Sequence, residues 1–324
     1  MASEPLVTHM YTADPSAHVF DGKIYIYPSH DRETDIKFND NGDQYDMADY
    51  HVLSLDDVGG PVTDHGIALK MEDVPWVSKQ LWAPDAATKD GKYYLYFPAR
   101  DQEGIFRIGV AVSDKPGGIF TPDPQPILGS YSIDPASFVD DDGQAYLYFG
   151  GIWGGQLQCW SSDKFDASMS GPQEPKGTGV PALLPRGAKL SDDMRSFASE
   201  VKQIPILDES GTLLAADDHD RRFFEAAWMH KYRGKYYFSY STGDTHYLVY
   251  AIGDNPFGPF TYVGRILEPV LGWTTHHSIV EFKGRWYLFY HDCSLSNGVD
   301  HLRCVRMREI VYDDQGHISL KEKQ

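Results

Sequence analysis

Residues 81–97 read LWAPDAATKDGKYYLYF, and the pattern of this stretch occurs five times along the chain. A glycine, Gly91, is followed three residues later by Tyr94, and Asp85 stands six residues before the glycine. The equivalent glycines are Gly22, Gly91, Gly143, Gly234 and Gly284, the tyrosines are Tyr25, Tyr94, Tyr146, Tyr237 and Tyr287, and the preceding ionisable residues are Asp14, Asp85, Asp134, Glu225 and His276. Aromatic and β-branched residues at period two favour strands, so each copy predicts strand, turn, strand.

The five turns differ in how strongly their sequences specify a hairpin. Three are aspartate-glycine pairs, which accept the positive φ of a two-residue hairpin turn, and two are weaker versions of the same signal. The aspartate-glycine pairs are Asp21-Gly22, Asp90-Gly91 and Asp142-Gly143, and the weaker pairs are Arg233-Gly234 and Lys283-Gly284.

The repeat predicts an all-β protein, a five-bladed β-propeller that forms one domain over residues 1–324. A unit of strand, turn and strand cannot bury its own apolar face, so copies must pack against one another. The glycines are 69, 52, 91 and 50 residues apart, which is too uneven for a solenoid. The two ends of the chain together supply about one more interval, so we expect them to share a blade. An ordinary β-sandwich with several hairpins is the alternative.

Composition restricts the partners. The chain of 324 residues carries 29 basic and 47 acidic residues, a formal charge of −18, which disfavours nucleic acid and anionic membranes and favours a neutral substrate. No stretch approaches the roughly 20 apolar residues of a membrane span. The N-terminal sequence lacks a secretion signal, and the three cysteines, Cys159, Cys293 and Cys304, have no metal-binding spacing. We therefore expect a cytoplasmic protein with free thiols.

Four segments outside the repeats are predicted to be loops or a short helix. Residues 165–190 are rich in glycine and proline and predict a long loop within the domain. Residues 191–203, with Ser191 as an N-cap, predict a short helix that walls one face of the propeller. The charge-rich residues 40–49 and 216–222 are interpreted as solvated loops.

The five ionisable residues should converge. If the first strand of each blade lies nearest the axis, residues at equivalent offsets before the glycine line the central channel at similar depth. Carboxylates gathered in a partly desolvated site have pKa values that move apart, which separates an acid from a base. Hydrolysis of a sugar acetal needs both, a protonated carboxyl for the departing oxygen and an ionised one for water or carbon. Aromatic residues, 14% of the chain, suit a β-rich core and stacking on sugar faces.

These motifs resemble glycoside hydrolase family 43 over essentially the whole chain. The matching stretches are TADPSAHVFDGKIYIYPSHD around Asp14, LWAPDAATKDGKYYLYF around Asp85, SIDPASFVDDDGQAYLYFGG around Asp134, FFEAAWMHKYRGKYYFSYS around Glu225 and THHSIVEFKGRWYLFYHD around His276. The resemblance implies a five-bladed propeller that hydrolyses glycosidic bonds of xylose and arabinose polymers with inversion.

The resemblance also implies roles for individual residues. Asp14 resembles the general base and Glu225 the general acid, while Asp134 resembles the carboxylate that orients the acid and tunes its pKa. We expect Asp134 to stay ionised so that Glu225 remains protonated near neutral pH. Inversion predicts that the Asp14 and Glu225 carboxyl groups stand roughly 6.5–9.5 Å apart.

Further positions are expected to bind the sugar or a metal ion. Trp82 and Arg303 resemble residues that bind the sugar, and Phe38 and Trp153 are added from their positions in loops after repeat strands. His276 resembles an axial histidine close to a bound calcium ion and its waters. The alternative is a hydrogen-bonded core histidine, because calcium prefers oxygen ligands. His277 should point to the opposite side of the strand.

Within the family the sequence is most similar to exo-acting β-xylosidases and α-L-arabinofuranosidases. This similarity rests on DNGDQYDMADYHVLS and RRFFEAAWMHKYRGKYYFSYSTGDTH. The predicted substrate is a small xylo- or arabino-oligosaccharide from which terminal β-D-xylose, α-L-arabinofuranose or both are released. The chain departs from the larger xylosidases in lacking a C-terminal β-sandwich. An endo-arabinanase and a non-catalytic sugar-binding propeller remain as alternatives.

Overall fold

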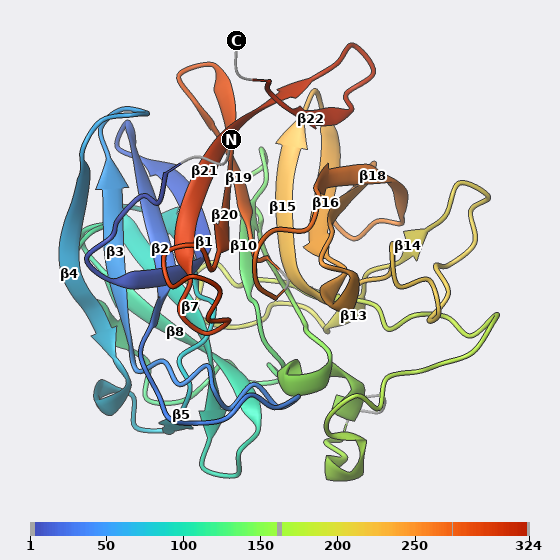
Figure 1. Cartoon of the computed structure of the whole chain (residues 1–324), viewed down its shortest axis with the longest axis horizontal. Coiled ribbons are helices and arrows are strands. Elements are labelled where there is room, and N and C mark those ends of the chain that lie inside the picture. Colours follow the sequence, from blue (N-terminus) through green and yellow to red (C-terminus); the bar gives the residue numbers. More distant parts are fainter. Residues whose placement is uncertain (1–3, 161–163, 274, 323–324) are drawn as a thin grey trace.

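The computed structural model describes residues 4–160, 164–273 and 275–322, and its strands form five sheets in this part of the chain (Figure 1). The first two sheets contain β1(Tyr11–Phe20), β2(Lys23–Asp31), β3(Asp49–Leu55) and β4(Val62–Lys70), and then β5(Val77–Lys79), β6(Asp85–Lys89), β7(Lys92–Asp101), β8(Phe106–Ser113) and β9(Thr121–Pro122). The third contains β10(Ala136–Val139), β11(Ala145–Phe149), β12(Arg186–Lys189) and β13(Lys202–Gln203). The fourth contains β14(Ile206–Leu207), β15(Glu225–Tyr232), β16(Lys235–Ser241), β17(Leu248–Gly253) and β18(Phe260–Leu267), and the fifth contains β19(Ser278–Phe282), β20(Arg285–Asp292), β21(Cys304–Tyr312) and β22(Ile318–Leu320).

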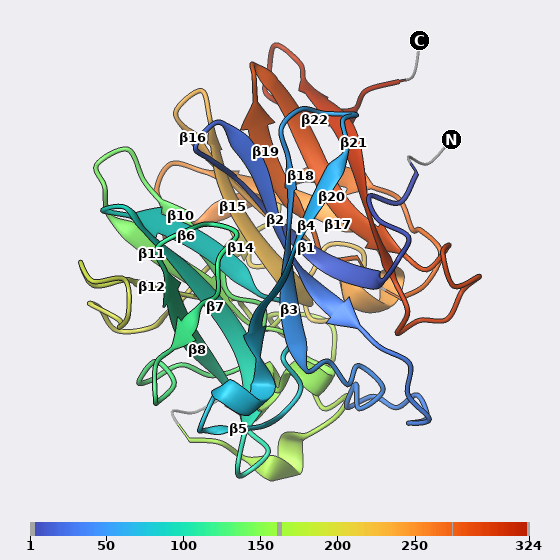
Figure 2. The ribbon, with the colours of Figure 1, turned by 90° about the vertical axis from the view of Figure 1, so that its left-hand side faces the viewer.

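The sheets are the blades of a five-bladed β-propeller, as predicted. The first strands of the five repeats, β1, β6, β10, β15 and β19, contact one another in a closed ring. Figure 2 shows blade β1–β4 between the blade that contains β6–β8 and the blade β19–β22. The strand nearest the axis is therefore the first strand of each repeat, which brings residues far apart in the sequence to one channel. That residues 1–324 form a single domain stays a prediction.

The prediction that the two chain ends share a blade is wrong. Strands β1–β4 form the first blade and β19–β22 the last, so each of these blades is built from consecutive strands. Backbone hydrogen bonds join the two blades instead, from the Leu6 amide to the Val305 carbonyl (2.9 Å) and from the Thr12 amide to the Arg303 carbonyl (2.9 Å). The ring closes by docking of the N-terminal segment against the start of β21.

Four of the five glycine turns have the predicted conformation. Asp21-Gly22 has φ of 51° and 76°, and the pairs at Gly91, Gly234 and Gly284 likewise place both residues at positive φ. Gly143 differs because Val139 pairs with Ala145, which leaves a five-residue loop in which the Asp140 amide donates to the Gln144 carbonyl. The weaker lysine and arginine versions thus form two-residue turns, and one aspartate-glycine pair does not.

Each inner strand is interrupted, or begins, at one level of the ring. The ladder between β1 and β2 skips Asp14 and Pro15, and the ladder between β15 and β16 skips Ala226 and Ala227. In the second blade β5 and β6 both pair with β7, and residues 80–84 between them lie outside the ladder, with the Trp82 amide donating to the Pro98 carbonyl of β7. Strand β10 begins directly after Pro135, and β19 begins at Ser278. Backbone released from the ladder is free to direct side chains into the channel.

The predicted helix at 191–203 is wrong. Ser191 accepts the Ser196 amide and donates to the Ser196 carbonyl, and Asp193 caps the Arg195 amide, so side chains bond the backbone in a turn. Short 3₁₀ helices occur at η1(Met71–Asp73), η2(Trp153–Gly155), η3(Leu157–Trp160), η4(Ala167–Met169) and η5(Gly243–Thr245). Among the described residues, no helix has the length and apolar character needed to cross a membrane.

Trp228 should be a main contributor to stability because it joins neighbouring blades. Its ring is 4% exposed in a core cluster with β19 and β20 residues, and its indole N–H donates to the Ile279 carbonyl at 3.2 Å. Trp228→Ala should lower the free energy of unfolding by about 3–5 kcal/mol in denaturant titrations. Leu128→Ala, at a side chain that is 91% exposed, is the control and should stay within about 0.5 kcal/mol of wild type. Equal stability of the two variants would contradict this packing.

Candidate active site

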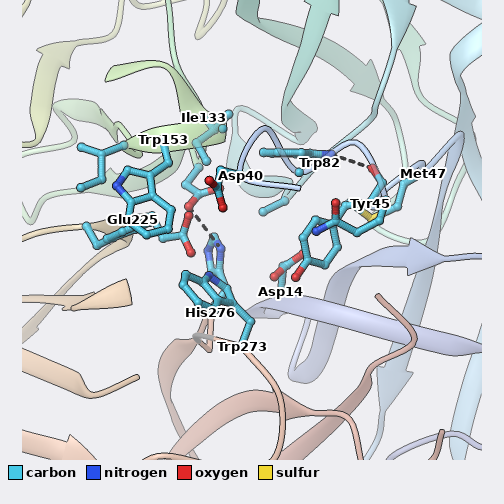
Figure 3. A pocket seen from close by; sticks show the side chains of 18 of the residues that line it. Asp14, Asp40, Tyr45, Met47, Trp82, Ile133, Trp153, Glu225, Trp273 and His276 are labelled. Atoms are coloured by element: carbon cyan, nitrogen blue, oxygen red, sulfur yellow. Dashed lines mark hydrogen bonds and ion pairs between the residues drawn. The ribbon is translucent and has the colours of Figure 1, made fainter. Parts of the chain in front are cut away.

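A cavity of about 320 Å³ opens at the interrupted ends of the inner strands. All eight residues predicted to act in catalysis, substrate binding or metal binding line it: Asp14, Phe38, Trp82, Asp134, Trp153, Glu225, His276 and Arg303. Figure 3 shows Asp14 beside Tyr45 on one side of His276, and Glu225 beside Trp153 on the other. The location is therefore common to all eight, while their individual roles stay predictions.

Local backbone strain directs the three carboxylates into this cavity. Asp14 and Asp134 have φ of 48° and 56°, and Ala226, which follows Glu225, has φ of 63°. Positive φ is uncommon for residues other than glycine and is maintained only where surrounding structure enforces it. At Asp14 and Asp134 the following proline has no N–H for ladder pairing, in agreement with the interruption that the sequence suggested.

Asp14 is held as an ionised carboxylate. Arg303 Nη1 donates to Asp14 Oδ1 at 3.0 Å, and Ser29 donates to Oδ2 at 2.7 Å. Burial alone would raise the pKa of Asp14, but the charge of Arg303, with further help from nearby groups, outweighs burial and lowers this pKa to about 2. At neutral pH the group can therefore accept a proton.

Glu225 has the opposite electrostatic environment. Burial, followed by the negative charge of Asp14, raises the pKa of Glu225 to about 8. Glu225 is therefore protonated at neutral pH and can donate a proton. The pocket thus separates one acid from one base, as the sequence led us to expect.

Asp134 does not have the pKa that we expected. Burial, then the charges of Glu225 and Asp14, raise the pKa of Asp134 well above its ordinary value. The Ala226 amide donates to Asp134 Oδ2 at 2.8 Å, so Asp134 is tied to the backbone next to Glu225. Asp134 and Glu225 titrate as a pair, and the ionised group that keeps Glu225 protonated is Asp14.

His276 lies against Asp134 at the axis. Its Nδ1 is 3.7 Å from Asp134 Oδ2, and burial lowers the pKa of His276, which favours the neutral imidazole. His277 points elsewhere, as predicted, and its Nε2 lies 2.6 Å from Ser239 Oγ. No group of three metal-ligating side chains includes His276 within the described ranges, so a calcium ion there would need water for most of its shell.

The four predicted sugar-binding residues differ in how they are held. Trp82 donates its indole N–H to the Tyr45 carbonyl at 2.8 Å, and Trp153 donates its own to Glu174 at 2.9 Å. Phe38 is 56% exposed at the cavity edge. The Arg303 guanidinium is shared between Asp14 and a second carboxylate, Asp31, at 2.7 Å, so its position is set by protein carboxylates.

Asp85, the second repeat residue, does not line the cavity. Its carboxylate bonds His18 Nε2 at 2.7 Å and Ser137 Oγ at 2.6 Å, and it is 1% exposed. Asp85 precedes its glycine by only six residues, whereas the other four precede theirs by eight or nine. Trp82 and Ala83, nine and eight residues before Gly91, line the cavity in its place.

Sequence reasoning missed several residues that build the site. Tyr45 and Met47 line the cavity from the charge-rich segment 40–49, which was interpreted as a solvated loop. An aromatic residue and a methionine within that charged stretch were the available signal. Trp273, Phe224 and Asp244 also line the cavity, and Asp31 accepts a hydrogen bond from Arg303 Nε. Phe224, Asp244 and Asp31 stand within the matching stretches, and Phe224 directly precedes Glu225, but which residues of those stretches reach the site depends on contacts between distant segments.

The site has the parts of a carbohydrate-hydrolysing enzyme, namely a carboxyl group that is protonated at neutral pH, a carboxylate that is ionised, and aromatic walls in one cavity. Comparisons with known proteins identify the family to which the chain belongs. The chain matches the profile of glycosyl hydrolases family 43 over residues 7–318 and belongs to this family. It is a glycoside hydrolase.

Named relatives and solved structures agree with this assignment. The chain is 78% identical to "Xylosidase/arabinosidase 43A" of Humicola insolens, covering 97% of this chain and 98% of the relative, and 60% identical to "Xylosidase/arabinosidase" of Bacteroides ovatus, covering 97% and 95%. A GH43 β-xylosidase/α-arabinofuranosidase from a compost microbial metagenome, solved with xylotriose in a calcium-free form, is 64% identical with a TM-score of 0.97 and 98% of each chain covered. A GH43_1 enzyme from Xanthomonas citri with xylotriose is 55% identical with a TM-score of 0.92, covering 98% and 93%.

The two shifted carboxyl groups predict the pH dependence of activity. If Asp14 is the base and Glu225 the acid, as predicted, activity requires Asp14 ionised, which holds above its pKa of about 2, and Glu225 protonated, which holds below its pKa of about 8. The value of kcat/KM should be flat across the weakly acidic range and fall about tenfold per pH unit above about pH 8. A pH profile on a natural disaccharide, with circular dichroism at each pH as the folding control, measures this. Activity that falls on acidification from about pH 7 to pH 5 would contradict the assignment.

Proposed function

We propose that this protein is an inverting, exo-acting glycosidase that releases terminal β-D-xylose, α-L-arabinofuranose or both from short oligosaccharides. The observation that carries the proposal is the pair of opposite pKa shifts on Asp14 and Glu225 in one cavity. The names of the relatives and the bound xylotriose of two solved structures support the sugar class. A cavity of about 320 Å³ suits the end of a chain better than its middle.

In the proposed reaction Asp14 accepts a proton from water while that water attacks the anomeric carbon. Glu225 gives its proton to the departing glycosidic oxygen, so the leaving alcohol departs neutral. After one turnover Asp14 holds a proton, Glu225 lacks one, and exchange with solvent restores both. Water must fit between base and sugar, so we expect the two carboxyl groups to stand roughly 6.5–9.5 Å apart.

Asp134 is proposed to position the acid. It accepts the Ala226 amide and shares a titration with Glu225, so its protonation changes the readiness of Glu225 to donate. Trp82, Trp153 and Phe38 are proposed to contact the apolar faces of the sugar. Arg303 is proposed to hold Asp14 ionised and to offer remaining N–H groups to sugar hydroxyls.

A calcium ion at His276 is proposed as a further part of the site. The neutral imidazole of His276 can act as a ligand, and the adjacent Asp134 carboxyl would be favoured in its ionised form by a nearby positive charge. Water would supply the remaining oxygens. A similar enzyme was solved in a calcium-free form, and this supports calcium as the ion proposed here.

A panel of substrates tests the proposed function. Aryl β-D-xyloside and aryl α-L-arabinofuranoside should both release the aryl group, and xylotriose should yield xylose from one end. Proton NMR early in the reaction should show the inverted anomer first. Internal cleavage of linear arabinan would instead identify an endo-arabinanase, and binding without any release would identify a sugar-binding propeller.

The leaving-group dependence of Glu225→Gln tests the acid. This variant should lose several orders of magnitude in kcat/KM on xylobiose but much less on an aryl glycoside whose leaving group needs no proton. Glu268→Gln, at an exposed surface ion pair, is the matched control and should retain activity. Thermal melts of both variants should stay near wild type. Equal losses on the two substrates would mean that Glu225 is not the acid.

Removal of divalent cations tests the calcium proposal. Protein treated with a chelator and dialysed should lose activity that calcium restores, and His276→Ala should respond less to added calcium than wild type. The measurement is initial rate against calcium concentration. If chelation leaves the rate unchanged, the calcium proposal is wrong and His276 is a hydrogen-bonded core histidine.

A further inference from the structure

A group of histidine and aspartate side chains lies on the first blade, outside the catalytic cavity. His30 is in β2, and Asp49 and His51 are in the paired strand β3. Each offers one possible ligand atom, and the three atoms lie within 4.8 Å of one another. Within the described residues this is the group of three or more side chains that could hold a metal ion.

The strand pairing fixes this arrangement. Ser29 of β2 lies opposite Tyr50 of β3, so His30 stands beside Asp49, and His51 lies two residues further on the same face of the strand. His30 Nδ1 is 2.6 Å from Asp49 Oδ1, and the rings of His30 and His51 are 4.8 Å apart between centroids. The ligand atoms therefore come from a rigid ladder, which suits a site for a specific ion.

The group is accessible yet partly shielded. The side chains of His30, Asp49 and His51 are 26%, 24% and 16% exposed. An ion can therefore enter from solvent, and water can complete its coordination. None of the three lines the catalytic cavity.

A second carboxylate orients His51 in the way that is usual behind a metal ligand. His51 Nδ1 lies 3.1 Å from Asp64 Oδ1, so the carboxylate places the ring proton on Nδ1 and the lone pair on Nε2. Asp64 is itself fixed, because it accepts the Gly66 amide at 2.8 Å and contacts His9 Nε2 at 2.9 Å. A histidine backed by a held carboxylate is a more basic and better-aligned ligand.

We propose that His30, Asp49 and His51 form a binding site for a divalent transition-metal cation of the Zn²⁺ class. Two imidazole nitrogens and one carboxylate oxygen suit Zn²⁺, Ni²⁺ or Cu²⁺, whereas Ca²⁺ prefers an all-oxygen shell. The formal charge of −18 on the chain favours cation binding generally. The site is chemically distinct from the calcium site proposed at His276.

The bound cation links β2 to β3 and so stabilises the first blade. His30 directly precedes Asp31, whose carboxylate holds Arg303 across the junction between the first and last blades. A cation that binds the folded protein and not the unfolded chain raises the unfolding temperature, and the rise grows with the logarithm of the free cation concentration once that concentration exceeds Kd.

Titration of the metal-free full chain with Zn²⁺ by calorimetry, in a His276→Ala background, tests the proposal. One Zn²⁺ should bind, and His51→Ala should weaken this binding by at least about tenfold, with Asp49→Asn giving a similar loss. His317→Ala is the matched control, since His317 pairs with Asp313 at 3.1 Å but belongs to no three-ligand group in the described part of the chain. This control should bind Zn²⁺ as its parent does.

A second readout identifies the ligands without relying on folding or activity. Electron paramagnetic resonance of the Cu²⁺-loaded protein should show coupling to two nitrogens, and His51→Ala should show one. Excess Ca²⁺ should not compete. The proposal is overturned if Zn²⁺ does not bind, if His51→Ala and His317→Ala bind it equally, or if Ca²⁺ displaces it at equal concentration.

Discussion

The bonding of Arg303 to two buried carboxylates is the interaction on which both the ring and the site depend. Its guanidinium contacts Asp31 through Nε and Nη2 and Asp14 through Nη1, while its backbone carbonyl accepts the Thr12 amide. These contacts join the first blade to the last. Loss of one partner would leave buried charge unpaired, at a cost of about 3–5 kcal/mol. The same guanidinium keeps Asp14 ionised, so closure of the propeller and ionisation of the proposed base share one side chain.

The charge held on Asp14 then adds to the effect of burial on Glu225, the proposed acid across the cavity. Glu225 is half-buried, its carboxyl is desolvated, and the Asp14 carboxylate adds repulsion, so the proton on Glu225 is retained at neutral pH. The interrupted inner strands make this possible because they direct both side chains inward from strained backbone at Asp14 and next to Glu225. Removal of the bulges would return these positions to the ladder and turn the side chains away.

The sequence predicted most of the fold because the repeat is local. Each glycine turn and its aromatic strand lie within about twenty residues, so spacing alone placed the inner strands and the offsets of eight or nine placed Asp14, Asp134, Glu225 and His276 in one cavity. The offset of six at Asp85 was the visible sign that this residue lies elsewhere.

Features that depend on distant contacts were not predictable: the docking of Thr12 on Arg303, the anchoring of Arg303 by Asp31, and the raised pKa of Asp134. The helix predicted at 191–203 is absent because the side chains of Ser191 and Asp193 form hydrogen bonds with the backbone in a turn.

The most direct test of this account is the titration of the Glu225 carboxyl itself, followed by carbon-13 NMR in wild-type protein and in Asp14→Asn. The account predicts a pKa near 8 in the wild type and a clearly lower value in the variant, because the repelling charge is gone and Arg303 is no longer neutralised by Asp14. A Glu225 pKa that is the same in both proteins would contradict it.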